Sequence, residues 1–96
     1  MIESFGDKAT EDFFHGRKTK RSRGFPAELL AVAHRKLDMM NAAHRLEDLK
    51  APSANRLEAL KGDLAGFHSI RINDQFRIVF RWSEGNASEV RIVDYH

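Results

Sequence analysis

The sequence contains no cysteine and, among its 96 residues, only two prolines, one tryptophan and one tyrosine. Without cysteine the fold can have no disulfide bonds and no thiolate chemistry, so it depends on packing alone, which suits a reducing cytoplasm. Apolar runs long enough to cross a bilayer are also missing, and residues 1–7 lack the basic start and apolar stretch of a secretory signal. These absences predict a cytoplasmic protein with no membrane partner.

A metal-ligand pattern is missing too. None of the histidines shows the spacing of a ligand set, such as a pair four residues apart on a helix. We therefore expect neither a catalytic metal ion nor another cofactor. The histidines are His15, His34, His44, His68 and His96.

The residues that are present describe one small globular domain, covering residues 1–96. Hydrophobic residues make up 42% and charged residues 31% of the chain, which separates it from disordered sequences with few apolar residues and a high net charge. A chain of this length has room for a single hydrophobic core.

The first half of the chain predicts helices. Asp7 is a suitable N-cap and Gly16 a stop signal, so we expect a helix over residues 8–15 with its apolar members buried: Ala9, Phe13 and Phe14. Pro26 opens the clearest helix of the chain, since proline fits the first helical position. Its core stripe is Leu29, Leu30, Ala33, Leu37, Met39 and Met40, with His34, Arg35, Lys36 and Asp38 on the remaining surface. Residues 41–50 predict one or two more helical turns, closed by Pro52.

The second half changes to the two-residue period of strands. Residues 68–73, 76–82 and 90–93 alternate apolar with polar side chains, and residues 73–74 and 84–86 supply the turns. Residues 2–5 alternate weakly, and residues 55–63 fit a helix or a strand equally well. Helices followed by antiparallel strands predict an α+β fold with two or three N-terminal helices on one face of a mostly antiparallel C-terminal sheet.

The last hairpin places an arginine near the end of the chain. If the chain reverses at residues 85–86, paired positions sum to about 171, so Arg77 lies opposite Asp94 or within about one residue of it. Arg77 would then stand on the exposed side of its strand, near Tyr95 and His96.

Two groups of basic residues suit a polyanion such as RNA. One is the run Arg17, Lys18, Lys20, Arg21 and Arg23, which contains no acid; the other is Arg71, Arg81 and Arg91 on successive predicted strands. The run could equally be a solvated loop, and arginines on alternate strand positions are common on the solvated face of a sheet.

Arg77 and the terminal residues together suit cleavage of RNA without a metal. Such cleavage needs a base for the 2′-hydroxyl proton, a fixed cation for the charge on the phosphate, and an acid for the departing 5′-oxygen. Arginine offers a fork-shaped phosphate donor, and histidine titrates most readily near neutrality.

Three segments resemble the HigB branch of the RelE-like toxins. They are RLEALKGD at residues 56–63, the strands at 69–73 and 76–80, and the end VDYH at 93–96, while the start MIESF is similar as well. The resemblance implies a RelE-like fold and a toxin that cleaves messenger RNA in the ribosomal decoding site. It also implies a helix-turn-helix antitoxin of the HigA type as partner, with operator DNA contacted only through that antitoxin.

The resemblance further implies roles for single residues. Lys61 and Arg77 would bind the scissile phosphate, while Asp94, Tyr95 and His96 would orient the nucleotide and transfer protons. Several relatives carry a histidine three residues before the lysine, where this chain has Glu58, so Glu58 is a candidate catalytic residue whose role stays open. The run at 17–23 would contact ribosomal RNA or acidic residues of the antitoxin.

Two rival functions need less chemistry. A non-catalytic RNA-binding domain would need the arginines but not His96. The other is a domain that has lost cleavage and only binds the antitoxin and supports repression, an alternative that the departure at Glu58 leaves open.

Overall fold

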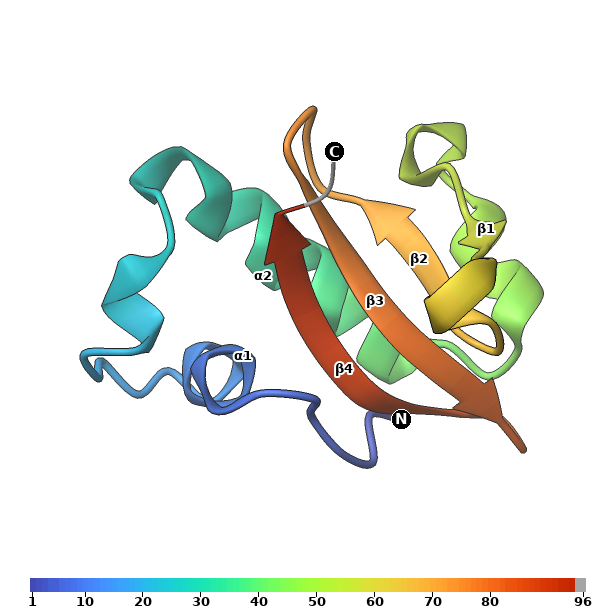
Figure 1. Cartoon of the computed structure of the whole chain (residues 1–96), viewed down its shortest axis with the longest axis horizontal. Coiled ribbons are helices and arrows are strands. Elements are labelled where there is room, and N and C mark those ends of the chain that lie inside the picture. The colour runs from blue at the N-terminus through green and yellow to red at the C-terminus, as the bar shows by residue number, and fades with distance from the viewer. Residues whose placement is uncertain (95–96) are drawn as a thin grey trace.

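The computed structural model describes residues 1–94 and shows two α-helices packed against a four-stranded antiparallel sheet of order β1-β2-β3-β4. Figure 1 shows α2 crossing behind the sheet and α1 beside β4. The predicted α+β class is confirmed. In chain order the elements are α1 (Lys8–Phe14), η1 (Ser22–Gly24), α2 (Ala27–Ala42), η2 (Leu46–Lys50), η3 (Ser53–Asn55), β1 (Glu58–Ala59), η4 (Gly62–Leu64), β2 (His68–Arg71), β3 (Phe76–Ser83) and β4 (Asn86–Asp94), where η marks a short 3₁₀ helix.

The register of the sheet gives each face its own chemistry. Ile70 pairs with Ile78, which pairs with Ile92, and all three face the core under α2. Between Val79 and Arg81 the register shifts, because β4 contains an extra residue at the point where Glu89 adopts a φ of 52°. Alternation then turns the neighbouring side chains of each strand to the opposite face.

The core forms where α2 meets the sheet. Leu29, Ala33, Leu37 and Met40 are at most 1% exposed, and burial of a Leu or Met side chain contributes about 1.5–3 kcal/mol to folding. Two expectations for this helix were wrong. Leu30 is exposed, because it lies at the edge of the stripe, whereas Lys36 is buried.

The buried side of α1 also differs from expectation. The helix ends at Phe14 rather than at residue 15, and Ala9, Phe13 and Phe14 are only half-buried. Instead Thr10 and Asp12 are buried, because both side chains form hydrogen bonds with polar groups of other segments. The Thr10 hydroxyl, for example, accepts a hydrogen bond of 2.9 Å from the backbone N–H of Ile92 in β4.

The weak alternation at residues 2–5 produces single bridges and no full strand. Ile2 and Phe5 lie parallel to β4 opposite Ala87 and Val90, and the backbone N–H groups of Glu3 and Gly6 donate to β4 carbonyls at 2.7 and 2.8 Å. This N-terminal segment and α1 therefore cover the outer edge of β4.

Residues 43–57, the connector, lead from α2 to β1. The predicted helical turns of 41–50 are present only as the end of α2 and as η2. The ambiguous stretch 55–63 is neither one helix nor one strand, since it contains the end of η3, the two residues of β1 and the start of η4. None of the helices described in residues 1–94 combines the length and apolar character that a bilayer span requires.

Candidate active site and basic surfaces

One face of the sheet, turned away from α2, carries the four strand arginines. Arg71 on β2 pairs with Arg77 on β3. Arg81 follows Arg77 in β3 by an even number of residues and so shares its face, and Arg91 on β4 pairs with Val79, which lies between Arg77 and Arg81. We call this the arginine face. It is not fully solvated, since Ser69 and Val79 in its middle are 0% exposed.

The side chain of Arg77 is only 11% exposed, compared with 32% for Arg71 and 46% for Arg81. Its Nε donates to Ser69 Oγ at 2.8 Å, and its Nη2 donates to the carbonyl oxygen of Arg56 at 2.7 Å. Arg56 has a left-handed backbone with a φ of 47°, which aims this carbonyl at the guanidinium. The expectation of a solvent-exposed Arg77 was therefore wrong, because the neighbouring β2 strand and the connector hold the guanidinium in place.

Glu58 and Lys61 stand on either side of the end of β1. Glu58 Oε1 lies 3.6 Å from Arg77 Nη2 and supplies its counter-charge, although the Glu58 side chain is 49% exposed. Lys61 is exposed and precedes η4, where its carbonyl accepts from the N–H of Leu64. Glu58 therefore reaches Arg77 directly, whereas Lys61 is a solvent-facing cation on the loop after β1.

The other strand arginines also have acidic or aromatic neighbours. Arg71 pairs with Asp74 in the following turn. Arg81 Nε lies 2.9 Å from Glu89 Oε2, and its guanidinium carbon is 4.1 Å from the centre of the Phe67 ring, a cation–π contact. Arg91 lines a cavity of about 170 Å³ that Phe67 and Leu64 also line, so the loop after β1 lies over this face.

The end of β4 confirms the hairpin geometry to within one residue. Arg77 is opposite Val93, and Asp94 is opposite Phe76, so Arg77 and Asp94 are neighbours in register but belong to opposite faces. Asp94 Oδ2 accepts a hydrogen bond of 2.9 Å from Gln75 Nε2. Tyr95 and His96, the other candidates here, lie outside the described residues. Within residues 1–94 no three carboxylate or histidine side chains gather as a metal site would require.

The basic segment, residues 17–23, lies beyond α1 on the β4 side of the sheet, away from β1 (Figure 1). Asp12, with a side chain only 2% exposed, organises it: Oδ2 accepts from Thr19 Oγ1 at 2.8 Å, and Arg17 and Arg21 lie 3.5 and 3.9 Å from the carboxylate. The hydrogen bond from Thr19, reinforced by Arg17, lowers the pKa of Asp12 despite its burial. The basic segment therefore lies apart from the arginine face and has an organising carboxylate of its own.

Sequence reasoning missed the two groups that position Arg77. Ser69 is an ordinary polar residue in an alternating strand, and nothing in the sequence marks its hydroxyl as an acceptor for an arginine on the neighbouring strand. The carbonyl of Arg56 is 21 residues from Arg77 in the chain, and a left-handed arginine leaves no local signal.

Comparison with known proteins gives the same picture from sequence and from structure. The family model described as the RelE-like toxin of the type II toxin-antitoxin system HigB matches residues 3–96. Toxin HigB-1 of Vibrio cholerae is 40% identical over 87 residues, covering 91% of this chain and 90% of the relative. Endoribonuclease HigB of Proteus vulgaris is 30% identical over 96 residues, covering both chains completely.

Solved structures confirm the fold. A chain of the YoeB-YefM complex from Staphylococcus aureus superposes with a TM-score of 0.59 at 18% identity, covering 100% of this chain and 98% of that one. The YoeB dimer from the same organism gives a TM-score of 0.55 at 20% identity, covering 99% and 97%. The predicted RelE-like architecture is therefore correct.

Proposed function

Because the chain belongs to the HigB family of RelE-like toxins of type II toxin-antitoxin systems, we propose that it is a ribosome-dependent endoribonuclease that cleaves messenger RNA in the decoding site. It acts in the cytoplasm, inhibits translation and arrests growth. A helix-turn-helix antitoxin of the HigA type neutralises it and carries it to operator DNA. The name of the Proteus vulgaris relative supports the nuclease activity, and the YoeB-YefM complex supports an antitoxin partner.

The observation that carries this proposal is the guanidinium of Arg77, fixed on the arginine face by Ser69 and by the carbonyl of Arg56. A cation held in place before substrate binds stabilises charge that develops on a phosphate without reorganising during the reaction. The other three strand arginines extend the positive field along the same face and attract the RNA backbone.

The proposed reaction is transesterification within the RNA, with no metal ion. A base removes the proton of the 2′-hydroxyl, a bond forms between the 2′-oxygen and phosphorus, and the bond from phosphorus to the 5′-oxygen breaks as an acid protonates that oxygen. The products are a 2′,3′-cyclic phosphate and a 5′-hydroxyl. Lys61 and Arg77 hold the phosphate, while Asp94, Tyr95 and His96 orient the nucleotide and transfer protons.

Glu58 is the proposed partner of Arg77 during this reaction. Its carboxylate is 3.6 Å from the guanidinium and half-exposed, so it can restrain Arg77 and also meet a bound nucleotide. Replacing Glu58 with Gln removes the negative charge but keeps the shape and a hydrogen-bonding oxygen. The variant therefore shows whether the charge of Glu58 is needed for these two roles.

The decisive test measures cleavage on ribosomes programmed with a defined messenger RNA, followed by primer extension. Arg77→Ala should lower the cleavage rate at least about a hundredfold, and Arg77→Lys should restore little of it, because lysine lacks the fork that Ser69 and Arg56 hold. Arg45→Ala, a change at an exposed arginine of the connector, is the matched control and should cleave normally.

Three outcomes would overturn parts of the proposal. Products with 3′-hydroxyl ends would exclude attack by the 2′-hydroxyl. Unchanged cleavage after deletion of His96 would exclude its proton-transfer role, for which a loss of at least about a hundredfold is expected. RNA binding without any cleavage by the wild-type protein would leave a binding domain or an antitoxin-binding co-repressor.

A further inference from the structure

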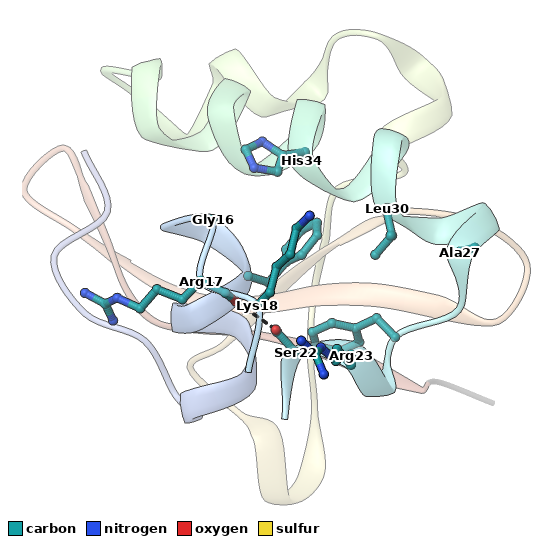
Figure 2. Close-up of a pocket in the computed structure, with 10 residues that line it drawn as sticks. Gly16, Arg17, Lys18, Ser22, Arg23, Ala27, Leu30 and His34 are labelled. Atoms are coloured by element: carbon teal, nitrogen blue, oxygen red, sulfur yellow. Dashed lines mark hydrogen bonds between the residues drawn. The ribbon is translucent and has the colours of Figure 1, made fainter. Parts of the chain in front are cut away.

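A groove separate from the arginine face opens between α1, the basic segment and the start of α2. Its volume is about 450 Å³, and Figure 2 shows lining side chains from all three elements around it, with the Arg17 side chain extending away from the others. The groove lies on the β4 side of the molecule, with α1 packed on β4 and on η1. Nothing in the proposed cleavage chemistry uses it.

The floor of the groove is apolar. Phe13 and Phe25 meet edge to face with ring centres 5.7 Å apart, and the ring of His34 lies 5.2 Å from that of Phe13. Leu30 completes the floor and is 37% exposed, one of only two large hydrophobic side chains exposed to that extent within residues 1–94. An aromatic wall beside an exposed leucine is the kind of surface that another apolar side chain covers.

The rim is positive, and its charge is only partly compensated. Arg17, Lys18 and Arg23 line the groove, and no acidic residue does. Arg17 is paired with Asp12, whereas neither Lys18 nor Arg23 has an ion pair in the part of the chain that the structure describes. Two unpaired cations therefore stand beside the apolar floor.

The groove is already formed before any ligand binds. Ser22 is buried, its hydroxyl donates to the carbonyl of Arg17 at 2.8 Å and accepts from the N–H of Thr19 at 3.0 Å, and Asp12 holds Thr19 from below. These bonds fix the loop that carries Lys18 and Arg23. A ligand would lose little affinity to ordering the loop.

We propose that this groove docks an acidic amphipathic segment of a partner protein. Its apolar side chains fill the floor against Leu30 and Phe25, and its carboxylates lie over Lys18 and Arg23. An RNA backbone would use the cations but would leave the apolar floor unfilled, so the combination favours a peptide over a nucleic acid. The inference does not depend on the nuclease activity.

The test uses three fluorescent probes and the full-length protein. The first is a 16-residue helical peptide with Leu at i, i+3, i+4 and i+7 on one face and Glu on the other. The second replaces its leucines with Ser at the same charge, and the third is an oligouridylate of equal charge. We expect the first probe to bind at least about tenfold more tightly than either of the others, a difference that two or three apolar contacts provide.

Variants locate the binding. Leu30→Asp should weaken binding of the first probe at least about tenfold, and Lys18→Glu combined with Arg23→Glu should do the same. Arg45→Glu combined with Lys50→Glu makes the same charge change on the connector and should leave binding unchanged. Thermal unfolding of each variant shows whether it is folded, and probe-induced NMR shifts should fall on residues 13–34.

Two results would overturn the proposal. One is equal affinity for the serine peptide or the oligouridylate, which would make the rim a phosphate-binding or nonspecific surface. The other is binding of the first probe that survives Leu30→Asp or maps to the arginine face.

Discussion

Two irregular segments of this protein are held in place by buried charges of opposite sign. The basic segment is organised by the carboxylate of Asp12, and the connector by the ammonium of Lys36, which donates to Asn55 Oδ1. Asn55 is 0% exposed, and its Nδ2 donates to the carbonyls of Leu49 and Ala51 at 3.1 and 3.4 Å. Each segment is thus held by one buried charged group and its hydrogen-bond partners, which we call its polar centre, in place of the repeated backbone hydrogen bonds of a helix or strand.

The two centres differ in how well their charge is compensated. Asp12 has a hydroxyl donor and three cations around it, and the hydrogen bond from Thr19 lowers its pKa, so its charged form is favoured in the fold. The pKa of Lys36 is lowered as well, but burial is the main cause, followed by repulsion from Arg35 and Arg71. For a lysine this means that the charged form is disfavoured. A lowered pKa therefore means that the charge of Asp12 stabilises the basic segment, whereas the charge of Lys36 strains the connector.

The difference matters for the site, because the connector contains Arg56, whose carbonyl holds Arg77. The groove lies on the well-compensated segment, and the positioning of Arg77 depends on the poorly compensated one. We expect changes at Lys36 or Asn55, the polar centre of the connector, to affect stability and cleavage together, whereas changes in the basic segment should leave cleavage chemistry intact.

Asn55→Ala should have the largest effect on stability. It removes the Lys36 acceptor and leaves a buried ammonium unpaired, which costs roughly 3–5 kcal/mol of unfolding free energy. Urea denaturation measures the loss, and cleavage by the remaining folded protein should fall because the carbonyl of Arg56 is released. A loss below about 1 kcal/mol would show that the connector is held by other contacts.

Asp12→Asn should have a smaller effect, confined to the basic segment. Asparagine keeps an acceptor for Thr19 but removes the charge that Arg17 and Arg21 surround. We expect a lower thermal midpoint and faster hydrogen exchange at residues 17–23, with unchanged exchange in β3. Stability from Asp12 is present above the unfolded carboxyl pKa of 3.8 and is lost as pH falls through the lower folded value, so the variant should lack this part of the acid dependence. Equal acid profiles for the two proteins would contradict this role.

Lys36→Met should have the smallest effect near neutral pH, within about 1.5 kcal/mol, because it removes a costly buried charge together with its hydrogen bond. The informative quantity is the pH dependence. Below the lowered folded pKa the wild-type protein carries the full cost of the buried charge, and this cost is relieved as pH rises toward the unfolded value of 10.5. Wild-type stability should therefore gain relative to the variant over that range, and parallel profiles would show that Lys36 is not strained.

Patterns local to the chain predicted the fold well. The two-residue period of β3 and β4 and the turn at residues 84–86 gave the last hairpin, and the stripe of α2 gave the core helix. The inward side of α1 was not predictable in this way, because Thr10 and Asp12 are buried for partners in β4 and in the basic segment.

The candidate site was predictable only in outline. Turn geometry placed Arg77 within one residue of Asp94, but alternation puts them on opposite faces. Lys36 lies three residues after Ala33, within reach of the buried stripe, yet its residue type suggested the surface; burial depends on Asn55, 19 residues later. Contacts between residues this far apart leave no periodic signal in a single sequence.

The N-terminal segment has a consequence for how these molecules behave at high concentration. Its bridges at Ile2 and Phe5, together with the hydroxyl of Thr10, occupy hydrogen-bonding groups along the outer edge of β4. The free N–H and C=O groups of an unpaired edge strand can hydrogen-bond to a strand of another molecule, and such pairing starts aggregation. At the other edge, β1 is only two residues long. The described residues thus leave a second copy few free backbone hydrogen-bonding groups at either edge of the sheet. This disfavours aggregation of the toxin through pairing of edge strands.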